Sequence, residues 1–392
     1  MRRIYFDHNA TSPASPEARE AMGPFLGDKF GNPSSVHRMG REAREAVENA
    51  RRQSAALINA DPSEIVFTSG GSEGDNMAIK GVLFNCLGKG GHIITTVVEH
   101  PAVLETFRFM ENFFGFKATY LPVDSSGMVD PDDLRQAIRK EKNTVLISVM
   151  AANNETGNIF PVREMASIAR EHGIIFHTDA VQVAGKLPVD VKEWGVDLLT
   201  ASGHKFNSPK GVGFQFVRNG VESKTPPVLI TGGHHEHGLR AGTENVPGIV
   251  ALGKACEMSM ASMSDKAKSI GAMRDGLEDG ILRNIPETAL NGHKENRMYN
   301  TSNISFKYVE AEAILQMLDM QGIAVSTGSA CSSETSEPSH VLQAMGLLPV
   351  CSRGAIRFSL GLGNTQDDVD YCLQALPSIV ERLQKMSPLF PA

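Results

Sequence analysis

One lysine, Lys205, is placed where it could do covalent chemistry. It lies in a loop rich in serine, glycine and histidine, directly after the apolar stretch 196–200. A lysine in such a setting can form a Schiff base with a carbonyl cofactor, and pyridoxal phosphate (PLP) is the usual one. Most loop lysines are solvated surface charges, so other residues must decide between a catalytic and a surface role.

Residues 68–76 could bind a phosphate group. They read Thr-Ser-Gly-Gly-Ser-Glu-Gly-Asp-Asn and follow an apolar run, which puts Gly71 and Ser72 at the entrance of a predicted helix. Free backbone N–H groups and the helix dipole attract an anion at such a place. The alternative is an ordinary turn with a helix N-cap.

Polar side chains also follow other predicted strands. Asp179 ends one strand and could pair with a protonated pyridine nitrogen, and Gln182 could then reach a ring hydroxyl. His100 and Asn154 come after two more strands. Each of these residues alone could be a helix cap or a turn former. Because open α/β sheets bind ligands at the carboxyl ends of their strands, we expect these side chains to meet in one crevice.

Of the five cysteines, Cys331 is predicted to be reactive. Its neighbours in the segment 326–338 are small and polar, so they offer no apolar surroundings to bury it. An exposed thiol on a mobile segment can act as a nucleophile, although free cysteines are more often buried and inert. Three others fall within apolar helical patterns and are predicted to be structural (Cys86, Cys256 and Cys372). The wide spacing predicts neither a disulfide framework nor a zinc site.

The run from His234 to His237 is a weak candidate for a metal site. Imidazoles and a carboxylate are good ligands, but adjacent histidines seldom face one ion together and no second cluster supplies the remaining ligands. We therefore expect no metal.

The elements that must position these residues are those of an α/β fold. From about residue 63, short β-rich runs alternate with amphipathic helical stretches, as in a mainly parallel sheet covered by helices. The runs are nearly continuous in apolar residues, as in strands buried on both faces. They are residues 64–68, 91–98, 144–150, 173–178, 196–199 and 211–217.

The pattern changes after a long predicted helix over about residues 245–283. An α+β mixture follows, with strands at 301–306, 322–326 and 354–359 and helices at 310–320 and 366–383. We expect a large domain over residues 15–258. A smaller domain would combine residues 1–14 and 259–392 and carry the mobile segment 326–338.

Composition excludes several other classes of protein. The 392 residues are 41% hydrophobic and 21% charged, enough for about two domains. The net charge of -7 is spread without a basic block, so no nucleic-acid partner is expected. No apolar run approaches the roughly 20 residues needed to cross a bilayer, and the first eight residues turn polar too early for a signal peptide. We expect a cytoplasmic protein without membrane contact.

A series of motifs resembles one enzyme family nearly end to end. The sequence is similar to cysteine desulfurases of the NifS/IscS type, in the class V aminotransferase family of fold-type I PLP enzymes. The motifs lie at residues 7–11, 31–37, 68–76, 99–100, 153–157, 177–182, 202–205, 240–245, 328–332 and 356–361.

The resemblance implies a mainly parallel seven-stranded sheet and a set of PLP-binding residues. Lys205 would hold the cofactor, and His100 would stack on the ring and move protons. Binding of the phosphate would fall to Gly71, Ser72, Ser202, His204 and, across a homodimer interface, Thr243 of the partner subunit. Binding of the ring would fall to Asp179, Gln182 and Asn154.

The resemblance also implies a substrate and a product. Arg357, with Asn154 and Asn9, would bind the carboxylate of L-cysteine. Cys331 would take the substrate sulfur as a persulfide, leaving L-alanine. The sulfur would pass to an iron-sulfur scaffold protein or another acceptor, for iron-sulfur cluster or thio-cofactor biosynthesis.

Alternatives remain at this point. The chain could be a selenocysteine lyase or another class V PLP enzyme, such as an aminotransferase, although transamination needs no thiol. It could also be a catalytically silent sulfur-relay or assembly protein. One departure from the family is Gly-Gly-His-His-Glu at residues 232–236, where many relatives have Gly-Gly-Gly-Gln-Glu. This change puts the sulfur acceptor in doubt more than the reaction.

Overall fold

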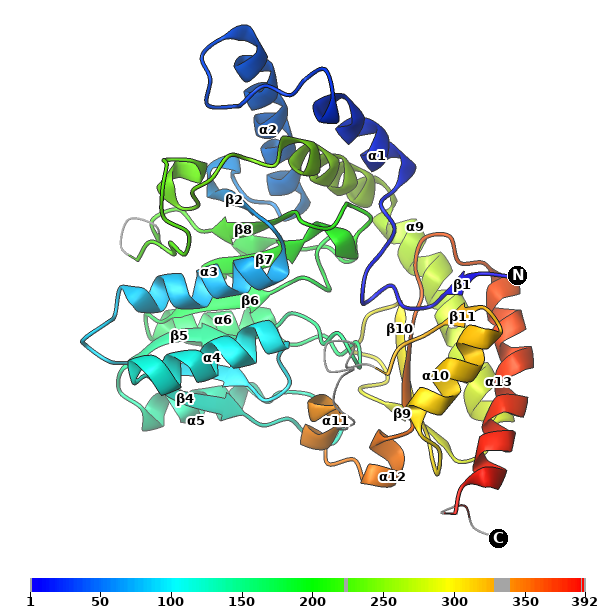
Figure 1. Ribbon diagram of the computed structural model, residues 1–392. Coiled ribbons are helices and arrows are strands. Elements are labelled where there is room, and N and C mark those ends of the chain that lie inside the picture. The colour runs from blue at the N-terminus through cyan, green and yellow to red at the C-terminus, as the bar shows by residue number, and fades with distance from the viewer. Residues whose placement is uncertain (1, 222–224, 328–338, 389, 391–392) are drawn as a thin grey trace.

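The computed structural model describes residues 2–221, 225–327, 339–388 and 390. A larger α/β unit lies beside a smaller unit of helices and strands, and the N-terminal segment runs across to the smaller one (Figure 1). The two units meet on the side where the sequence predicts the functional residues.

The central sheet of the described chain has seven strands, in the order β2-β8-β7-β6-β5-β3-β4. The strands are β2 (Ile65–Thr68), β3 (His92–Thr96), β4 (Lys117–Leu121), β5 (Thr144–Ser148), β6 (Ile175–Asp179), β7 (Leu198–Ser202) and β8 (Gly213–Val217). Adjacent strands are parallel from β4 to β7, and β8 is antiparallel to both β7 and β2. All strands except β8 therefore end at the same edge of the sheet.

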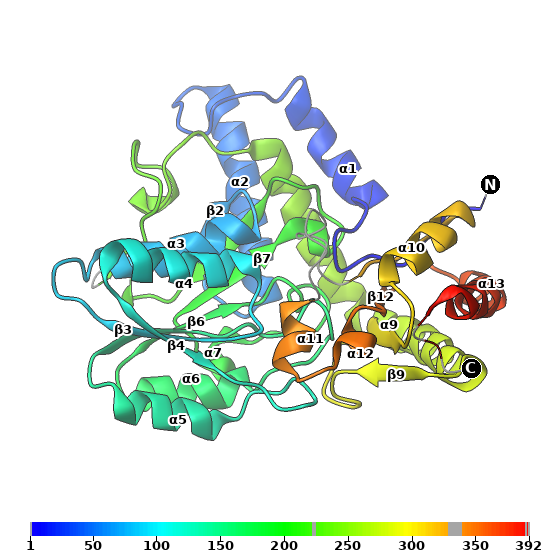
Figure 2. The ribbon, with the colours of Figure 1, turned by 60° about the horizontal axis from the view of Figure 1, so that its bottom comes forward.

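Helices cover both faces of this sheet. Figure 2 shows α3 (Gly71–Phe84) and α4 (Pro101–Phe114) on one face and α5 (Pro131–Lys140) and α6 (Val162–Glu171) on the other. Met77 and Ile79 of α3 and Phe107 of α4 are fully buried against Ile93 and Leu146 of the strands. Burial of each such side chain stabilises the fold by about 1.5–3 kcal/mol.

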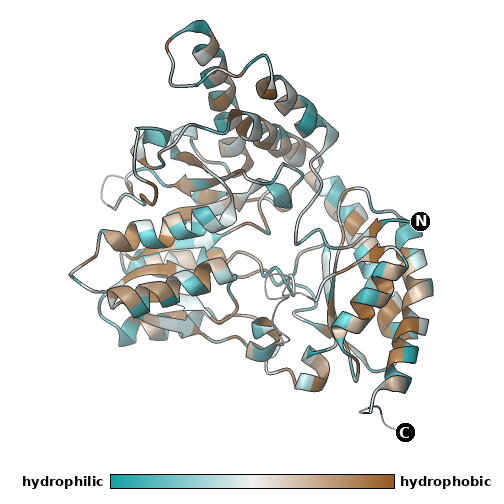
Figure 3. Ribbon diagram, in the orientation of Figure 1, coloured by the Kyte–Doolittle hydropathy of each residue, from teal (hydrophilic) through white to brown (hydrophobic). Residues whose placement is uncertain are grey.

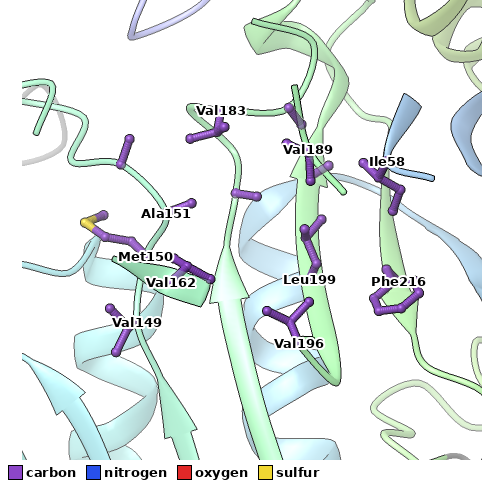
Figure 4. Packing of buried hydrophobic residues seen from close by; sticks show 14 of the residues in the cluster. Ile58, Val149, Met150, Ala151, Val162, Val183, Val189, Val196, Leu199 and Phe216 are labelled. Carbon is purple, nitrogen blue, oxygen red and sulfur yellow. The ribbon is translucent and has the colours of Figure 1, made fainter. Parts of the chain in front are cut away.

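The other face has its own apolar layer. Figure 4 shows Val149, Leu199 and Phe216 pointing into this layer from neighbouring segments of the sheet region. Met165 and Ile168 of α6 belong to the same buried cluster. Apolar residues on both sides explain why these strands have nearly continuous apolar sequences.

The smaller unit has a sheet in the order β12-β10-β9, with antiparallel neighbours. Its elements are β9 (Thr288–Asn291), β10 (Thr301–Phe306), β12 (Ala355–Ser359), α10 (Ala311–Met320) and α13 (Gln366–Met386). A separate core includes Phe306, Leu318, Phe358 and Leu376. Figure 3 shows that α10 and α13 carry both hydrophobic and hydrophilic residues, as helices packed on one side do.

Two connections join the units. The 39-residue helix α9 (Val246–Asn284) buries Leu252 and Cys256 in the core of the larger unit and Leu277 in that of the smaller one. At the N-terminus, β1 (Ile4–Tyr5) pairs in parallel with β11 (Ile323–Ala324). The residues after β1 then cross to the edge of the large sheet.

One of the remaining helices, α2 (Arg38–Leu57), buries Ala43, Val47 and Ala50 in the core of the larger unit, and the others are short. The short ones are α1 (Pro16–Met22), α7 (Val191–Trp194), α11 (His340–Ala344) and α12 (Pro349–Ser352), with 3-10 turns at η1 (Gly23–Leu26), η2 (Pro62–Glu64), η3 (Gly203–Lys205) and η4 (Glu236–Gly238). In the described ranges, no helix has the length and apolar character that crossing a bilayer requires.

The structure confirms the α/β class and the seven-stranded sheet. The strand predicted at 196–199 lies at 198–202, and β4, which was not predicted, forms the edge of the sheet. Lys117 at the start of β4 is exposed, so this strand lacks the continuous apolar run of its neighbours. The domain boundaries at residues 14 and 258 stay a prediction. Cys256 and Cys372 are buried, and Cys86 lies half-buried just beyond α3.

Candidate functional site

A cavity of about 530 Å³ lies at the carboxyl edge of the large sheet. We call it the central cavity. It is lined by Asn9, Ala10, Gly71, Ser72, Asp75, His100, Pro101, Met150, Asn154, Glu155, Asp179, Val181, Gln182, Ser202, His204, Lys205, His340 and Arg357. This size is ordinary for a site that holds a small ligand. The sheet edge thus brings together residues that are far apart in the sequence.

One end of the central cavity is the start of α3. Gly70 has φ +148°, and a Cβ on Gly71 would lie 2.9 Å from Val181 Cγ2, so both positions favour glycine. The first N–H groups of a helix have no partner within it. Ser72 lines the cavity beside them, and Ser202, which is 2% exposed, contributes a second hydroxyl from the end of β7. This arrangement suits an anion.

His204 lies near the same end. Its Nδ1 is 3.1 Å from Thr11 Oγ1. Burial, followed by the charges of Lys205, Lys210 and Lys186, lowers the pKa of His204 to about 4. The imidazole is therefore neutral near pH 7 and can act as a hydrogen-bond donor.

Asp179 ends β6 with a buried carboxylate. Its Oδ1 accepts a hydrogen bond from the Val181 N–H at 2.9 Å, which is the bond of a turn cap. Burial is the main cause that raises the pKa of Asp179 to about 6, while the Val181 bond and the charge of Lys205 lower it. The cap and the proposed ring contact are compatible, because the second carboxylate oxygen is left for a cationic partner.

Lys205 lies in η3, directly after β7. Its Nζ donates to the carbonyl oxygens of Asn9 at 2.5 Å and Ala10 at 2.9 Å. The same segment makes a second contact, in which the Ser12 hydroxyl donates to the His204 carbonyl at 2.7 Å. The N-terminal segment is thus held against the loop that carries the lysine.

Gln182 and Asn9 lie beside this lysine. Gln182 Nε2 donates to the Asn9 carbonyl at 3.1 Å, so Lys205 and Gln182 share one acceptor. The side chain of Asn9 donates to Thr301 Oγ1 at 2.8 Å and to the Asn154 carbonyl at 3.2 Å. Asn9 therefore ties the larger unit to β10 of the smaller one.

Arg357 reaches the central cavity from β12 and is 2% exposed. Its Nη2 is 2.7 Å from Asp7 Oδ1, and its Nη1 donates to the Asn154 carbonyl at 2.9 Å. A buried guanidinium is well suited to bind a carboxylate, because it can donate two parallel hydrogen bonds. Asp7 and Asn154 fix its position.

His100 precedes α4 and acts as its N-cap. The ring Nδ1 accepts a hydrogen bond from the Ala102 N–H at 3.1 Å, which places the ring proton of the neutral form on Nε2. Burial, followed by the charges of Lys205 and His340, lowers the pKa of His100 to about 4. The imidazole that lines the cavity is thus a neutral donor.

Three polar residues that line the cavity were not predicted: Asp75, Glu155 and His340. His340 Nε2 lies 3.0 Å from the Glu99 carbonyl, and Glu155 accepts a hydrogen bond from Ser339. Burial and the charge of Asp179 raise the pKa of Asp75, whose Oδ1 has no hydrogen-bond partner among the described residues. Asp75 is one turn into α3, on the same helix face as the phosphate-binding candidates, and this spacing could have revealed it.

The roles expected of Cys331 and Thr243 stay predictions. Cys331 lies outside the described residues. Thr243 is exposed and does not line the cavity, and its predicted role requires a partner subunit. Across the described ranges, no three His, Cys, Asp or Glu side chains are grouped to hold a metal ion. His234 and His237 instead lie on the surface, flanking a Glu236 carboxylate that is buried against Arg51.

The residues of the central cavity fit PLP. The start of α3 offers N–H groups and hydroxyls for a phosphate, and the Asp179 carboxylate offers an acceptor for a protonated ring nitrogen. Lys205 supplies an amine in the same cavity. The donor set thus matches a ligand with an anionic group and a cationic ring atom.

Comparisons with known proteins agree with this geometry. Residues 4–372 match the family described as aminotransferase class-V. The chain is 52% identical over 387 residues to the cysteine desulfurase IscS of Dictyoglomus turgidum, covering 99% of this chain and 97% of that protein. It is 49% identical to the cysteine desulfurase IscS of Methanosarcina thermophila, covering 100% and 95%.

Solved structures give the same result. A NifS-like protein superposes with a TM-score of 0.90 at 38% identity, covering 97% of this chain and all of that one. A structure described as SspA in complex with cysteine has a TM-score of 0.80 at 37% identity, covering 91% and 98%. The chain therefore belongs to the class V aminotransferase family and, within it, to the PLP-dependent cysteine desulfurases.

Proposed function

We propose that this protein converts L-cysteine to L-alanine and that Cys331 receives the sulfur. The observation that carries this proposal is the central cavity, where the Lys205 amine, the Asp179 carboxylate and the start of α3 lie together with Arg357. The first three suit PLP, and the guanidinium suits the carboxylate of an amino acid. The cysteine desulfurase relatives and the cysteine complex of a structural neighbour support the substrate.

Arg357 would bind the substrate carboxylate. Its Nη1 contact with the Asn154 carbonyl and its ion pair with Asp7 hold the guanidinium in place before substrate arrives. A rigid, buried guanidinium loses little conformational entropy on binding. Asn9 and Asn154 would then border the amino acid, as the sequence analysis predicts.

The next residues handle charge and protons. When bound, PLP supplies an electron sink that stabilises negative charge on the Cα of an amino acid. Asp179 would keep the ring nitrogen protonated, because a carboxylate with few other partners favours a nearby cation. Lys205, displaced by the substrate amine, would carry the Cα proton. His100 would present an Nε2–H donor to the central cavity.

Cys331 would take the sulfur. Its thiolate attacks the sulfur of the substrate, the Cβ–S bond of L-cysteine breaks, and a new S–S bond forms on the enzyme. The electron pair of the broken bond stays with Cβ and is protonated, so that one L-cysteine and one thiol give one L-alanine and one persulfide. Cys256 and Cys372 are unsuited to this role, because burial raises the pKa of both to about 12 and keeps them as thiols.

The wider setting is also part of the proposal. We expect a homodimer in which Thr243 of the partner subunit reaches the phosphate, and a sulfur acceptor such as an iron-sulfur scaffold protein. The cytoplasmic location stays a prediction from the sequence.

The direct test quantifies L-alanine and sulfide together, from the purified protein with L-cysteine and a thiol reductant. Equal amounts over many turnovers are expected. If PLP-loaded protein forms neither product, the proposal is contradicted. A much faster rate on L-selenocysteine than on L-cysteine would instead identify a selenocysteine lyase.

Lys205→Ala tests the assignment of the lysine. The variant should lose turnover entirely, because no other amine in the described part of the chain lines the central cavity. Turnover at the wild-type rate would refute the role of Lys205. Lys210→Ala is a matched control, since Lys210 is exposed and does not line the cavity.

A further inference from the structure

A second lysine, Lys186, is buried behind the central cavity. It is 8% exposed and does not line the cavity. Burying an amine costs free energy unless it has a hydrogen-bond partner. Lys186 Nζ donates to Gln182 Oε1 at 3.1 Å, from a position four residues later in the same turn. The partner is therefore a residue of the site already described.

The backbone that places Lys186 is closely packed. Gly185 has φ +74°, and a Cβ there would lie 2.6 Å from Phe206 Cγ, so glycine is required. Phe206 directly follows Lys205 in the chain. The turn that carries Gln182 and Lys186 is thus packed against the loop that carries the reactive lysine.

The charges around Lys186 favour its neutral form. Burial, followed by the charges of Lys205 and Arg357, lowers the pKa of Lys186 to about 7. His8 also faces it, and burial followed by the charge of Lys186 lowers the pKa of His8 to about 4. The charged groups that lower the pKa of Lys186 are thus cationic. Within the described ranges no carboxylate forms an ion pair with Lys186, and its amine serves as a hydrogen-bond donor.

The contacts of Gln182 fix the direction of its amide group. The Asn9 carbonyl can only accept, so Nε2 must face it, and Oε1 then faces Lys186. An amide nitrogen has two hydrogens, and the Asn9 carbonyl takes one of them. The second hydrogen is left on a side chain that lines the central cavity.

We propose that Lys186 is a positioning residue, which holds the Gln182 oxygen and so presents the amide NH₂ group to an oxygen anion on the cofactor ring. This inference rests on the proposed function, because it requires PLP in the central cavity. Without Lys186, the Gln182 oxygen loses its donor, so only the Asn9 contact holds the amide and its second N–H is no longer fixed toward the ring.

The consequence is measurable without turnover. A donor at the ring oxygen favours the ionised form of the bound chromophore, so its loss should raise the apparent pKa of the cofactor absorbance. Losing the charge of a nearby lysine would shift this pKa in the same direction. The two causes must therefore be separated.

A double-mutant cycle separates them. Holoenzymes with Lys186→Met, Gln182→Leu and both changes are titrated by absorbance, together with the wild type. We expect each single change to raise the apparent pKa by about one unit, a tenfold change in the equilibrium. The double variant should shift no further than Gln182→Leu alone, because Lys186 acts through Gln182. Lys210→Met, a control that removes an exposed lysine near His204, should leave the pKa unchanged.

Three results would overturn the inference. They are an unchanged pKa in Lys186→Met, additive shifts in the double variant, or an equal shift in Lys210→Met. Lys186→Leu replaces the methionine variant if the latter does not fold, as judged by circular dichroism. A wild-type protein that binds no PLP would instead refute the proposed function, so the two failures are distinguishable.

Discussion

Replacing Asp179 with asparagine should stabilise the cofactor-free protein and at the same time inactivate the enzyme. The carboxylate is 6% exposed, and its Oδ1 accepts the Val181 N–H. An asparagine of the same shape keeps an acceptor for that bond but carries no charge. The substitution therefore removes a buried charge with little change in packing.

The magnitude follows from the pKa of Asp179. Burial raises this pKa from 3.8 to about 6, so the folded protein holds the proton more tightly than the unfolded chain does. Stability is therefore lost as the pH rises from 3.8 to about 6, and it stays lost above that range. At 1.36 kcal/mol per pKa unit, the penalty is about 3 kcal/mol. We expect the free energy of unfolding of the variant to exceed that of the wild type by about 3 kcal/mol at pH 8 and by almost nothing at pH 4.

Activity should change in the opposite direction. The lost carboxylate would no longer hold a protonated ring nitrogen. Removing one preorganised electrostatic partner from an active site costs about 100-fold to 1000-fold in rate. The variant should therefore release L-alanine at least about 100-fold more slowly than the wild type.

Urea unfolding of the cofactor-free wild type and variant at pH 8 and pH 4 tests the expected gain in stability. Alanine release by the PLP-loaded enzymes tests the expected loss of activity. Asp197→Asn is the matched control. Asp197 is a buried carboxylate in the same sheet region, but it accepts the Phe176 N–H at 2.8 Å and pairs with Arg218, so its loss should destabilise. A less stable Asp179→Asn variant at pH 8, or an equal gain at both pH values, would refute the reasoning.

Three further substitutions test other parts of the molecule. Cys331→Ala should keep PLP and bind L-cysteine yet release no alanine; an undiminished alanine rate would move the nucleophile elsewhere. Gly71→Ala puts a Cβ 2.9 Å from Val181 Cγ2 at the start of α3, so PLP should bind about 10-fold more weakly in equilibrium dialysis, and unchanged affinity would contradict the anion site. Glu236→Gln leaves the buried Arg51 guanidinium without its 2.7 Å ionic partner and should cost about 3 kcal/mol in urea unfolding; a loss below about 1 kcal/mol would mean that the pair is not buried in solution.

Strand periodicity predicted most of the larger unit, because strands buried on both faces have continuous apolar sequences. β4 was missed for the same reason, since an edge strand with an exposed Lys117 does not have such a run. The strand β11 lies within the one predicted at 322–326, but its partner β1 was not predicted, because the two strands pair across more than 300 residues. No local pattern encodes a contact of that kind.

The site residues that directly follow a predicted strand, such as His100, Asp179 and Lys205, could be predicted from the sequence. His340 was missed because it follows no predicted strand: it begins the short helix α11, which packs on the core of the larger unit and brings the imidazole to the Glu99 carbonyl. The orientation of the Gln182 amide could not be predicted from the sequence either, because it depends on contacts with both Asn9 and Lys186. The roles assigned to Cys331 and Thr243 stay predictions.

The crossing of the N-terminal segment also has a consequence for protein synthesis. Asn9 N donates to Ser359 Oγ, 350 residues later, and Asp7 pairs with Arg357. Asp7 and Asn9 must therefore wait until residues 357–359 have been synthesised before these contacts form. At roughly 5 to 20 residues per second, the delay is roughly 20 to 70 s. During that time the nascent chain can build the large sheet, but it cannot complete the wall around Lys205.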